Sequence, residues 1–575
     1  MAFDYAKLPH EHPRRYVPRT MEVRWEDLSG VFKELKSRPL SSRAELERWI
    51  ADEDELNAVV YERKALVNVN FSRQTDDGES KKAYVDFVQD LEPKVKLASF
   101  ELTQKYVSSL ARRELPPAYS MSDKSRKNAA EIFREENVAL EKEDAELVEK
   151  YQGLMGAMTV SYKGEEKTLQ QADKFLEGTD RSVREEVWRL STARLLGDLK
   201  ELDGIYTRMV KVRDTIGRNA GFGNYRDFVF RQKNRFDYTP EDCARFHEAV
   251  ARHMVPLSRE IDEERMRDLG VDELRPWDLS VDPQGRPPLA PFSSAEGLVD
   301  GCAKVFRKVD PQFSSYFDRM TALGLRDLES RKGKAPGGFQ DEFTELRLPF
   351  IFMNAAQRDS DVRTLLHESG HSFHTLLMRD AGLPFYNSSQ NLPAEFAEVA
   401  SISMELVGGA HLAGAFYGPE DAKRSNKAEV GRIIKLFTWV ATIDAFQHWV
   451  YANPGHSEGE RAEKWSEIFK RFSGLESYEG LEEAMVYRLH RQLHVYVFPF
   501  YYIEYGIATL GALGIWFRYM KDPSGAISAY KRALSLGSSK PLPELFRTAD
   551  LPWDLGSGAI ESYARQLRSA WKSYS

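Results

Sequence analysis

Two histidines four residues apart, with a glutamate directly after the first, carry the strongest chemical signal in the chain. The run is His367-Glu368-Ser369-Gly370-His371. On an α-helix this spacing places His367 and His371 on one face, one turn apart, where two neutral imidazoles can share one Zn²⁺. Glu368 lies on the same side and can reach a water at the metal without ligating the metal itself. The pattern predicts a zinc site that carries its own general base.

Two histidines need a third protein ligand, and its position decides the kind of site. A third histidine on the same helix would require Gly at position 374 and His at position 377, but the chain has His374 and Leu377. The alternative is a glutamate from a following helix. We expect that helix at 393–406, because Pro393 suits a first helical turn and Gly408-Gly409 suits a helix end.

Three glutamates on this expected helix compete for the metal: Glu395, Glu398 and Glu405. Glu398 and Glu405 are seven residues apart and share one face, whereas Glu395 is offset by about 60°. The neighbours of Glu398 are small, which suits close packing against the histidine helix. We predict that Glu398 is the ligand and that Glu405 orients an imidazole. Glu395 is the reserve candidate.

The histidines need a helix to hold them, and the sequence predicts one over 361–380. Ser360 is the expected N-cap, and Gly382 stands just past the end. Gly370 leaves room for another segment to approach. Residues 339–343 and 348–353, directly before this helix, are typical of two short strands. We therefore expect a mainly α fold with a small β element beside the metal helix.

The chain has 575 residues, which is too long for one compact core, so we expect several lobes. Helical periodicity dominates, apart from a proline-rich loop at 282–291 and a small hairpin at 158–169. The hairpin indicates a joint. We predict an N-terminal helical lobe at 1–157, a hairpin-containing connector at 158–180 and a catalytic metallopeptidase domain at 181–575.

Composition argues against several classes of protein. The net charge of −8 and the pI near 6.0 do not suit a nucleic-acid partner. The two cysteines, Cys243 and Cys302, form no CxxC pair, which excludes a disulfide scaffold and favours the cytoplasm. Residues 1–15 contain no apolar stretch, so we expect no secretory signal, and Pro499 and Glu504 interrupt the most apolar long stretch. We expect no membrane partner.

Several runs resemble the oligoendopeptidase F and thimet oligopeptidase family of zinc metallopeptidases, and its oligoendopeptidase F branch in particular. The run 364–374 is similar to the family's HExGHxxH helix, and 397–401 is similar to its third-ligand segment, which favours Glu398 over Glu395. Supporting runs lie at 219–225, 235–238, 274–279 and 349–354. The resemblance implies one Zn²⁺ per chain and a multi-lobed helical body. Its deep channel would admit short unfolded peptides and exclude folded proteins.

The resemblance also implies a second cluster that completes the site. His494, Tyr501 and Tyr505 match it as donors of hydrogen bonds to a developing oxyanion, each contributing roughly 3 kcal/mol. Tyr496 and Tyr502 match it less well, and we expect them to contact the substrate. The alternative is that these tyrosines form an aromatic core.

Two departures from the family's pattern bear on this cluster and on the strands. Ile503 stands where branch members often have a further tyrosine, and Phe339-Gln340 replaces the usual tyrosine-cysteine after two glycines, which leaves residue 340 without a predicted role. We expect the strand at 348–353 to pair with the peptide backbone as an added strand, with Phe350 and Phe352 beside the substrate.

These residues predict a zinc-dependent endopeptidase of the gluzincin type that cleaves short unstructured oligopeptides. Glu368 would take a proton from water as general base and later deliver it to the leaving amine. One alternative is a metallo-carboxypeptidase, which needs a fixed cation for the free C-terminal carboxylate; the sequence does not identify that cation. The other is a zinc-bearing peptide-binding protein without turnover, against which the intact Glu368 argues.

Overall fold

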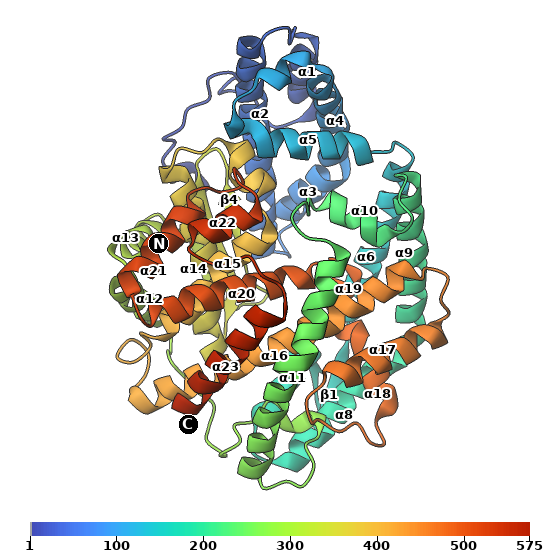
Figure 1. Cartoon of the computed structure of the whole chain (residues 1–575), viewed down its shortest axis with the longest axis vertical. Helices are drawn as coiled ribbons and strands as arrows, with labels where there is room; N and C mark the ends of the chain where they lie inside the picture. The colour runs from blue at the N-terminus through green and yellow to red at the C-terminus, as the bar shows by residue number, and fades with distance from the viewer. Residues whose placement is uncertain (1–2, 575) are drawn as a thin grey trace. The chain divides into compact units, whose positions relative to one another are not determined.

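The computed structural model describes residues 3–574 and confirms the mainly α class (Figure 1). The chain is 69% helical, and its strands form two small sheets in the described part. None of the described helices combines the length with the apolar composition that crossing a membrane requires.

Contacts between residues divide the chain into two compact units, each assembled from segments that are distant in sequence. The first unit comprises the chain up to Glu131, Ala290–Ala422 and Gly511–Trp553. The second comprises Ile132–Leu289, Lys423–Leu510 and the chain from Asp554 onward. The predicted division at 157 and 180 runs along the sequence and stays a prediction.

The first unit contains an N-terminal group of helices and a later group around a sheet. The N-terminal helices are α1 (Trp25–Ser37), α2 (Arg43–Arg73), α3 (Gly78–Asp86), α4 (Glu92–Ser108) and α5 (Ser120–Ile132). The later helices are α12 (Ala295–Val309), α13 (Pro311–Ala322), α14 (Asp359–Asp380), α15 (Ala394–Gly409), α21 (Pro523–Leu534) and α22 (Leu542–Thr548). Trp49 and Leu56 of α2 are buried in the apolar core of the N-terminal group.

A three-stranded sheet in the first unit precedes α14. Its order is β3 (Arg326–Glu329), β5 (Leu348–Ala355) and β4 (Phe339–Phe343), with β3 parallel and β4 antiparallel to β5. The two predicted strands are confirmed as β4 and β5. Since β5 is hydrogen-bonded on both sides, the prediction that it accepts a peptide as an added strand is wrong. In the described sheet, β4 is the strand next to the metal helix that has a free edge.

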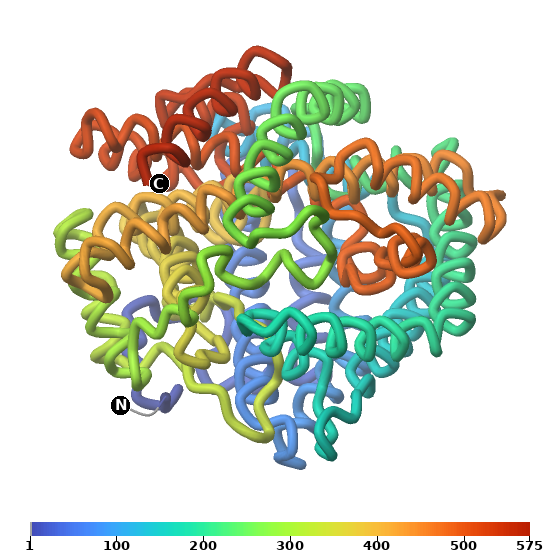
Figure 2. Tube along the Cα trace, turned by 90° about the horizontal axis from the view of Figure 1, so that it is seen from below, coloured from blue at the N-terminus to red at the C-terminus, as the bar shows by residue number. Residues whose placement is uncertain are grey.

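The second unit is built from long helices and a hairpin. Its elements are α6 (Asn137–Gly156), β1 (Thr159–Tyr162), β2 (Glu165–Thr168), α7 (Leu169–Asp173), α8 (Arg181–Gly197), α9 (Leu199–Asn219), α10 (Tyr225–Gln232), α11 (Pro240–Leu269), α17 (Glu458–Phe472), α18 (Glu482–Val486), α19 (Leu493–Tyr496) and α23 (Ser557–Ser573). Two of the unit boundaries fall inside long helices, α16 (Pro419–Ala452) and α20 (Tyr502–Tyr519). Helix α11 packs against α23, and both views show these helices side by side (Figures 1 and 2).

The hairpin predicted at 158–169 is confirmed. Strands β1 and β2 pair antiparallel from Thr159↔Thr168 to Tyr162↔Glu165. Lys163 and Gly164 form the turn, with φ of 53° and 79°. Two consecutive residues with positive φ are typical of the tight turn that matches the twist of the two strands.

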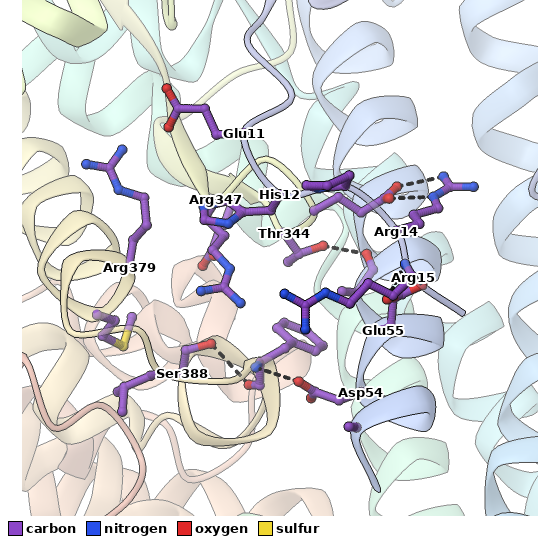
Figure 3. Close-up of a pocket in the computed structure, with 18 of the residues that line it drawn as sticks. Glu11, His12, Arg14, Arg15, Asp54, Glu55, Thr344, Arg347, Arg379 and Ser388 are labelled. Carbon is purple, nitrogen blue, oxygen red and sulfur yellow. Dashed lines mark hydrogen bonds and ion pairs between the residues drawn. The ribbon is translucent and has the colours of Figure 1, made fainter. Parts of the chain in front are cut away.

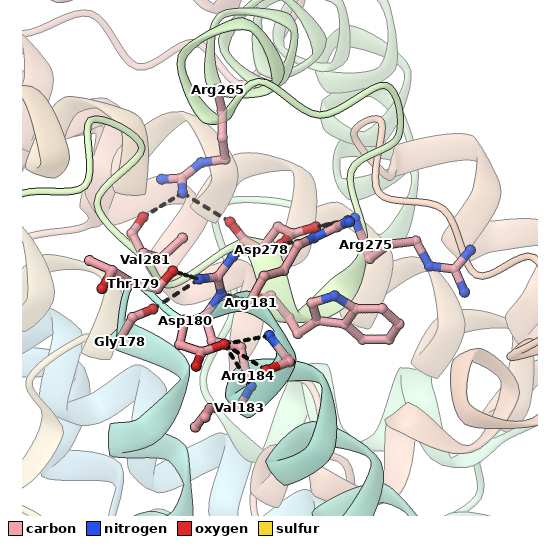
Figure 4. Close-up of polar contacts among 12 residues, drawn as sticks. Gly178, Thr179, Asp180, Arg181, Val183, Arg184, Arg265, Arg275, Asp278 and Val281 are labelled. Carbon is pink, nitrogen blue, oxygen red and sulfur yellow. Dashed lines mark hydrogen bonds and ion pairs between the residues drawn. The ribbon is translucent and has the colours of Figure 1, made fainter.

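A buried carboxylate fastens α8 of the second unit to the loop after α11 (Figure 4). Both oxygens of Asp278 accept hydrogen bonds from Arg181, at 3.0 and 2.7 Å, and Arg184 Nη2 donates to Oδ1 at 2.9 Å. Burial alone would raise the pKa of Asp278, but these hydrogen bonds hold that pKa below its usual value. This residue lies in the run 274–279, so that run has a structural role here.

Candidate metal centre

The histidine helix α14 packs closely along α15, and a glycine makes this possible. A Cβ atom on Gly370 would lie 2.6 Å from both the carbonyl oxygen of Ala400 and Cα of Ser401. Contacts that short do not occur, so any other residue would push the two backbones apart. The small residue between the two histidines therefore sets the distance from α14 to the glutamates of α15.

The start of α14 differs from its prediction. The helix begins at Asp359, and the predicted N-cap Ser360 lies inside it. Asp361 supplies the missing cap, because its Oδ2 accepts hydrogen bonds from the backbone N–H groups of Ala356 and Arg358 at 2.7 and 2.9 Å. The predicted end is confirmed, with Gly382 at φ 69° just past Asp380.

The three predicted ligands lie together in the first unit. One ligand atom from each of His367, His371 and Glu398 falls within 4.8 Å of the others. Oε2 of Glu398 is 3.4 Å from Nε2 of His367 and 3.7 Å from Nε2 of His371. Separations of this size suit donor atoms that share one ion, because zinc binds nitrogen and oxygen at about 2.0–2.2 Å.

Two further contacts orient these ligands. Oε1 of Glu405 lies 2.7 Å from Nδ1 of His367, and the hydroxyl of Ser401 donates to Oε2 of Glu398 at 2.9 Å. Since a carboxylate only accepts, Nδ1 of His367 carries a proton, which makes Nε2 the nitrogen available to a metal. Glu405 thus has the place predicted for it, whereas the part played by Ser401 was not predicted.

The electrostatics of the cluster favour a cation. Burial lowers the pKa of His371 to about 4, so this imidazole is neutral, which is the form that binds metals. Burial opposes the charge on Glu398, but the hydrogen bond to His367 lowers its pKa to about 2. Burial would also lower the pKa of His367, yet Glu398 and Glu405 raise it well above its usual value, so a metal binding at Nε2 would displace a proton from it. Two imidazoles and the carboxylate of Glu398 make a donor set that fits Zn²⁺.

Glu368 lies beside this cluster and is only 6% exposed. Burial raises its pKa to about 7, with the nearby Glu398 and Glu405 acting in the same direction. The backbone amide of Gln340, on β4, hydrogen-bonds to it. Gln340 acts through its main chain, so its side chain could not have signalled this contact in the sequence.

Two cavities in the first unit adjoin α14. The smaller, of about 200 Å³, is lined by His371 and by the β4 residues Gln340 to Glu342. The larger, of about 380 Å³, shares Glu342, Thr375 and Met378 with it and is lined by four arginines (Figure 3). They are Arg14, which pairs with Glu345, and Arg15, Arg347 and Arg379.

The predicted second cluster lies in the second unit, where four of its residues come together. The ring of His494 is 5.8 Å from that of Tyr501, 4.7 Å from Tyr502 and 5.9 Å from Tyr505. The rings of Tyr501 and Tyr505 are 5.1 Å apart. The arrangement matches the predicted grouping, and its role in chemistry stays a prediction.

Tyr496 and the two phenylalanines of β5 are placed differently. Tyr496 is fully buried, its ring is stacked on Tyr151 at 3.8 Å, and its hydroxyl donates to the carbonyl of Leu202. Phe350 and Phe352 are also 0% exposed. These three side chains therefore offer no exposed surface for the substrate contacts predicted for them.

A sequence profile of Peptidase family M3 matches residues 175–553, and the chain belongs to this family. An oligoendopeptidase F homolog of Mycoplasma pneumoniae is 22% identical over 375 residues, which are 60% of this chain and 56% of that protein. The matched relatives among curated proteins are covered over only 39% to 56% of their own length. The resemblance found in the sequence is confirmed.

Solved structures of other proteins have a similar fold over nearly the whole length of this chain. An X-ray structure of an oligoendopeptidase F is 27% identical, has a TM-score of 0.89 and covers 100% of this chain and 99% of its own. PZ peptidase A, solved with an inhibitor, is 25% identical, has a TM-score of 0.87 and covers 98% of this chain and 99% of its own. The helical architecture is therefore shared with these peptidases.

Proposed function

We propose that the chain is a zinc-dependent endopeptidase, of the gluzincin type, that hydrolyses internal bonds of short unstructured oligopeptides. The observation that carries the proposal is the convergence of His367, His371 and Glu398, with Glu368 beside them and Glu405 behind His367. Membership of a peptidase family and the name of the M. pneumoniae relative support peptide-bond hydrolysis as the reaction. A deep substrate channel and a cytoplasmic location belong to the same proposal.

Within this proposal each residue has one task. His367, His371 and Glu398 hold the ion, and Glu405 and Ser401 keep two of these ligands in position. When bound, Zn²⁺ polarises the scissile carbonyl and lowers the pKa of water at the site toward about 7.

Glu368 takes a proton from the attacking water and delivers it to the leaving amine. His494, Tyr501 and Tyr505 donate hydrogen bonds to the carbonyl oxygen as it gains charge. Tyr502 contacts the substrate, and the free edge of β4 can pair with its backbone.

A carboxypeptidase is the second candidate, and the larger cavity favours it. Arg347 and Arg379 line that cavity, and such fixed cations can bind a free C-terminal carboxylate. Comparison of a peptide with its C-terminal amide separates the two functions. We expect the amide to be cleaved at the same internal bond with similar kcat/KM, and loss of cleavage on amidation would favour the carboxypeptidase.

The proposal is tested by Glu368→Gln, which keeps the shape of the side chain and removes its basicity. We expect the variant to retain zinc and peptide affinity while kcat falls at least ~10²-fold, the lower range for loss of a general base. Glu395→Gln, another buried glutamate of the first unit, is the matched control and should keep kcat. A Glu368 variant with nearly wild-type turnover would remove the proposed role, and so would an active protein without metal.

A further inference from the structure

Two helices of the second unit each carry a pair of potential metal ligands that the proposed peptidase site does not use. Cys243 and His247 are four apart on α11, and Asp444 and His448 are four apart on α16. Each spacing puts its two side chains on one helix face. The pairs face each other, because Nε2 of His247 lies 2.8 Å from Oδ2 of Asp444.

The donor atoms come close enough to share an ion. One ligand atom from each of Cys243, Asp444 and His448 lies within 4.8 Å of the other two. Nε2 of His448 is 3.3 Å from Oδ2 of Asp444, and the rings of His247 and His448 are 5.7 Å apart. This is the same closeness as in the candidate peptidase site.

One of these atoms, Oδ1 of Asp444, has no hydrogen-bond partner in the described part of the chain, and the side chain of Asp444 is completely buried. Nε2 of His448 is buried as well and lies 3.3 Å from Oδ2 of the same carboxylate. A buried carboxylate oxygen without a partner costs about 1–3 kcal/mol or more. A bound cation would satisfy this oxygen and could take the imidazole nitrogen as a second ligand, whereas the hydrogen bonds among the described residues leave the oxygen unsatisfied.

The donor set and its surroundings indicate which ion fits. Thiolate, imidazole and carboxylate together suit Zn²⁺ or a similar transition metal, whereas Mg²⁺ and Ca²⁺ prefer oxygen ligands alone. Phe230 and Phe500 pack on His448 at 6.0 and 5.4 Å between ring centroids, which gives the site an apolar wall. Nε2 of His448 is buried, although 12% of the side chain is exposed.

We propose that the second unit binds one Zn²⁺-like ion through Cys243, Asp444 and His448. His247 holds Asp444 in place through its hydrogen bond to Oδ2, as the outer partners of metal ligands do. The ion links α11 to α16. It is separate from the ion of the peptidase site, whose ligands all belong to the first unit.

Metal counting tests the proposal without relying on activity. The double variant His367→Ala/His371→Ala removes two ligands of the first site, and elemental analysis of it should find about one zinc per chain. Adding Cys243→Ser should lower the count to near zero, while adding Cys302→Ser should leave it unchanged. Cys302 is the matched control because it is the other cysteine of the chain and is buried in the first unit.

A spectroscopic measurement on the unmutated protein covers the case in which a variant fails to fold. Protein produced with Co²⁺ in place of Zn²⁺ should show a thiolate-to-cobalt charge-transfer band in the near ultraviolet. The proposed peptidase site contains no sulfur ligand, so this band reports on Cys243 alone. Wild-type protein that takes up cobalt without the band, or a first-site double variant that holds no metal, would overturn the proposal.

Discussion

Oε1 of Glu405 lies 2.7 Å from Nδ1 of His367, on the side of the ring away from the proposed metal position. This contact places a proton on Nδ1 of His367. The other ring nitrogen, Nε2, lies 3.4 Å from Oε2 of Glu398. Two glutamates seven residues apart on α15 therefore hold one imidazole from both sides. The contact also makes the imidazole more basic, which strengthens its bond to a metal.

Removal of this carboxylate should weaken metal binding without abolishing it. We expect Glu405→Ala to bind zinc roughly 10–100-fold more weakly, the usual effect of losing a partner of a metal-bound histidine. Competition with a chelating zinc indicator measures the change. Ser403→Ala on the same helix is the control and should bind zinc normally. Unchanged affinity in the Glu405 variant would show that the contact does not tune the metal.

The choice between the two candidate ligand glutamates of α15 can be settled by metal content. Glu398→Ala should lose zinc, because its Oε2 faces both Nε2 atoms of the histidines. Glu395→Ala should keep a full equivalent, since Glu395 is outside the cluster of close ligand atoms. Elemental analysis of the two purified variants is sufficient. The reverse pattern would move the ligand three residues upstream.

The helices that carry the metal residues could be predicted because their signals are local. The spacing of His367 and His371, the glycine at 382 and the glycines at 408–409 can all be interpreted within a few residues of each helix. Glu398 and Glu405 are seven residues apart, and helix geometry alone puts residues with this spacing on one face. The structure bears out both helices and this shared face.

The features that were missed depend on contacts between distant segments. Strand β3 contains Arg326, Asp327 and Glu329 and shows no apolar alternation, so no strand signal was present. It forms beside β5, and Asp327 is held by an ion pair to Arg73 of α2 at 2.8 Å. The interleaving of segments in the two units likewise leaves no local pattern in the sequence.

Gly370 is the position where a single methyl group should disturb the site most. In Gly370→Ala the new Cβ would meet the backbone of α15 at 2.6 Å, and backbone cannot move aside cheaply. We expect a loss of about 1–3 kcal/mol in unfolding free energy and weaker zinc binding. Gly204→Ala, on α9 with no atom within 4 Å of its added Cβ, should be neutral or stabilising. Equal stability of both variants would contradict the close approach.

Tyr501 and Tyr505 test whether the aromatic cluster of the second unit takes part in the reaction. Tyr→Phe removes the hydroxyl and keeps the ring that packs against His494. We expect each variant to lose roughly 10²–10³ in kcat, with zinc content and Tm unchanged, if the hydroxyls bind the developing oxyanion. Tyr61→Phe, at an exposed position, is the control. Wild-type rates in both variants would make the tyrosines part of the core and leave the oxyanion role to His494 and the metal.

Glu62 of α2 should make the stability of the protein depend on pH. It is 3% exposed, Tyr5 donates to one of its oxygens at 2.5 Å, and the amide of Glu345 donates to the other at 2.8 Å. Burial raises the pKa of Glu62 from 4.5 to about 8. The folded chain therefore binds this proton more tightly than the unfolded chain, so stability is full below about pH 4.5 and is lost as the pH rises toward 8.

One such group contributes a slope of at most about 1.4 kcal/mol per pH unit. We expect urea unfolding between pH 6.5 and 8 to show stability falling with pH, and Glu62→Gln, which fixes the neutral state, to show a shallower fall. This window lies above the pKa of Asp54, which burial raises to about 6, so that carboxyl contributes less there. Glu26→Gln on the exposed face of α1 should keep the wild-type slope. Equal slopes for the wild type and the Glu62 variant would mean that Glu62 is already ionised in the folded protein at neutral pH.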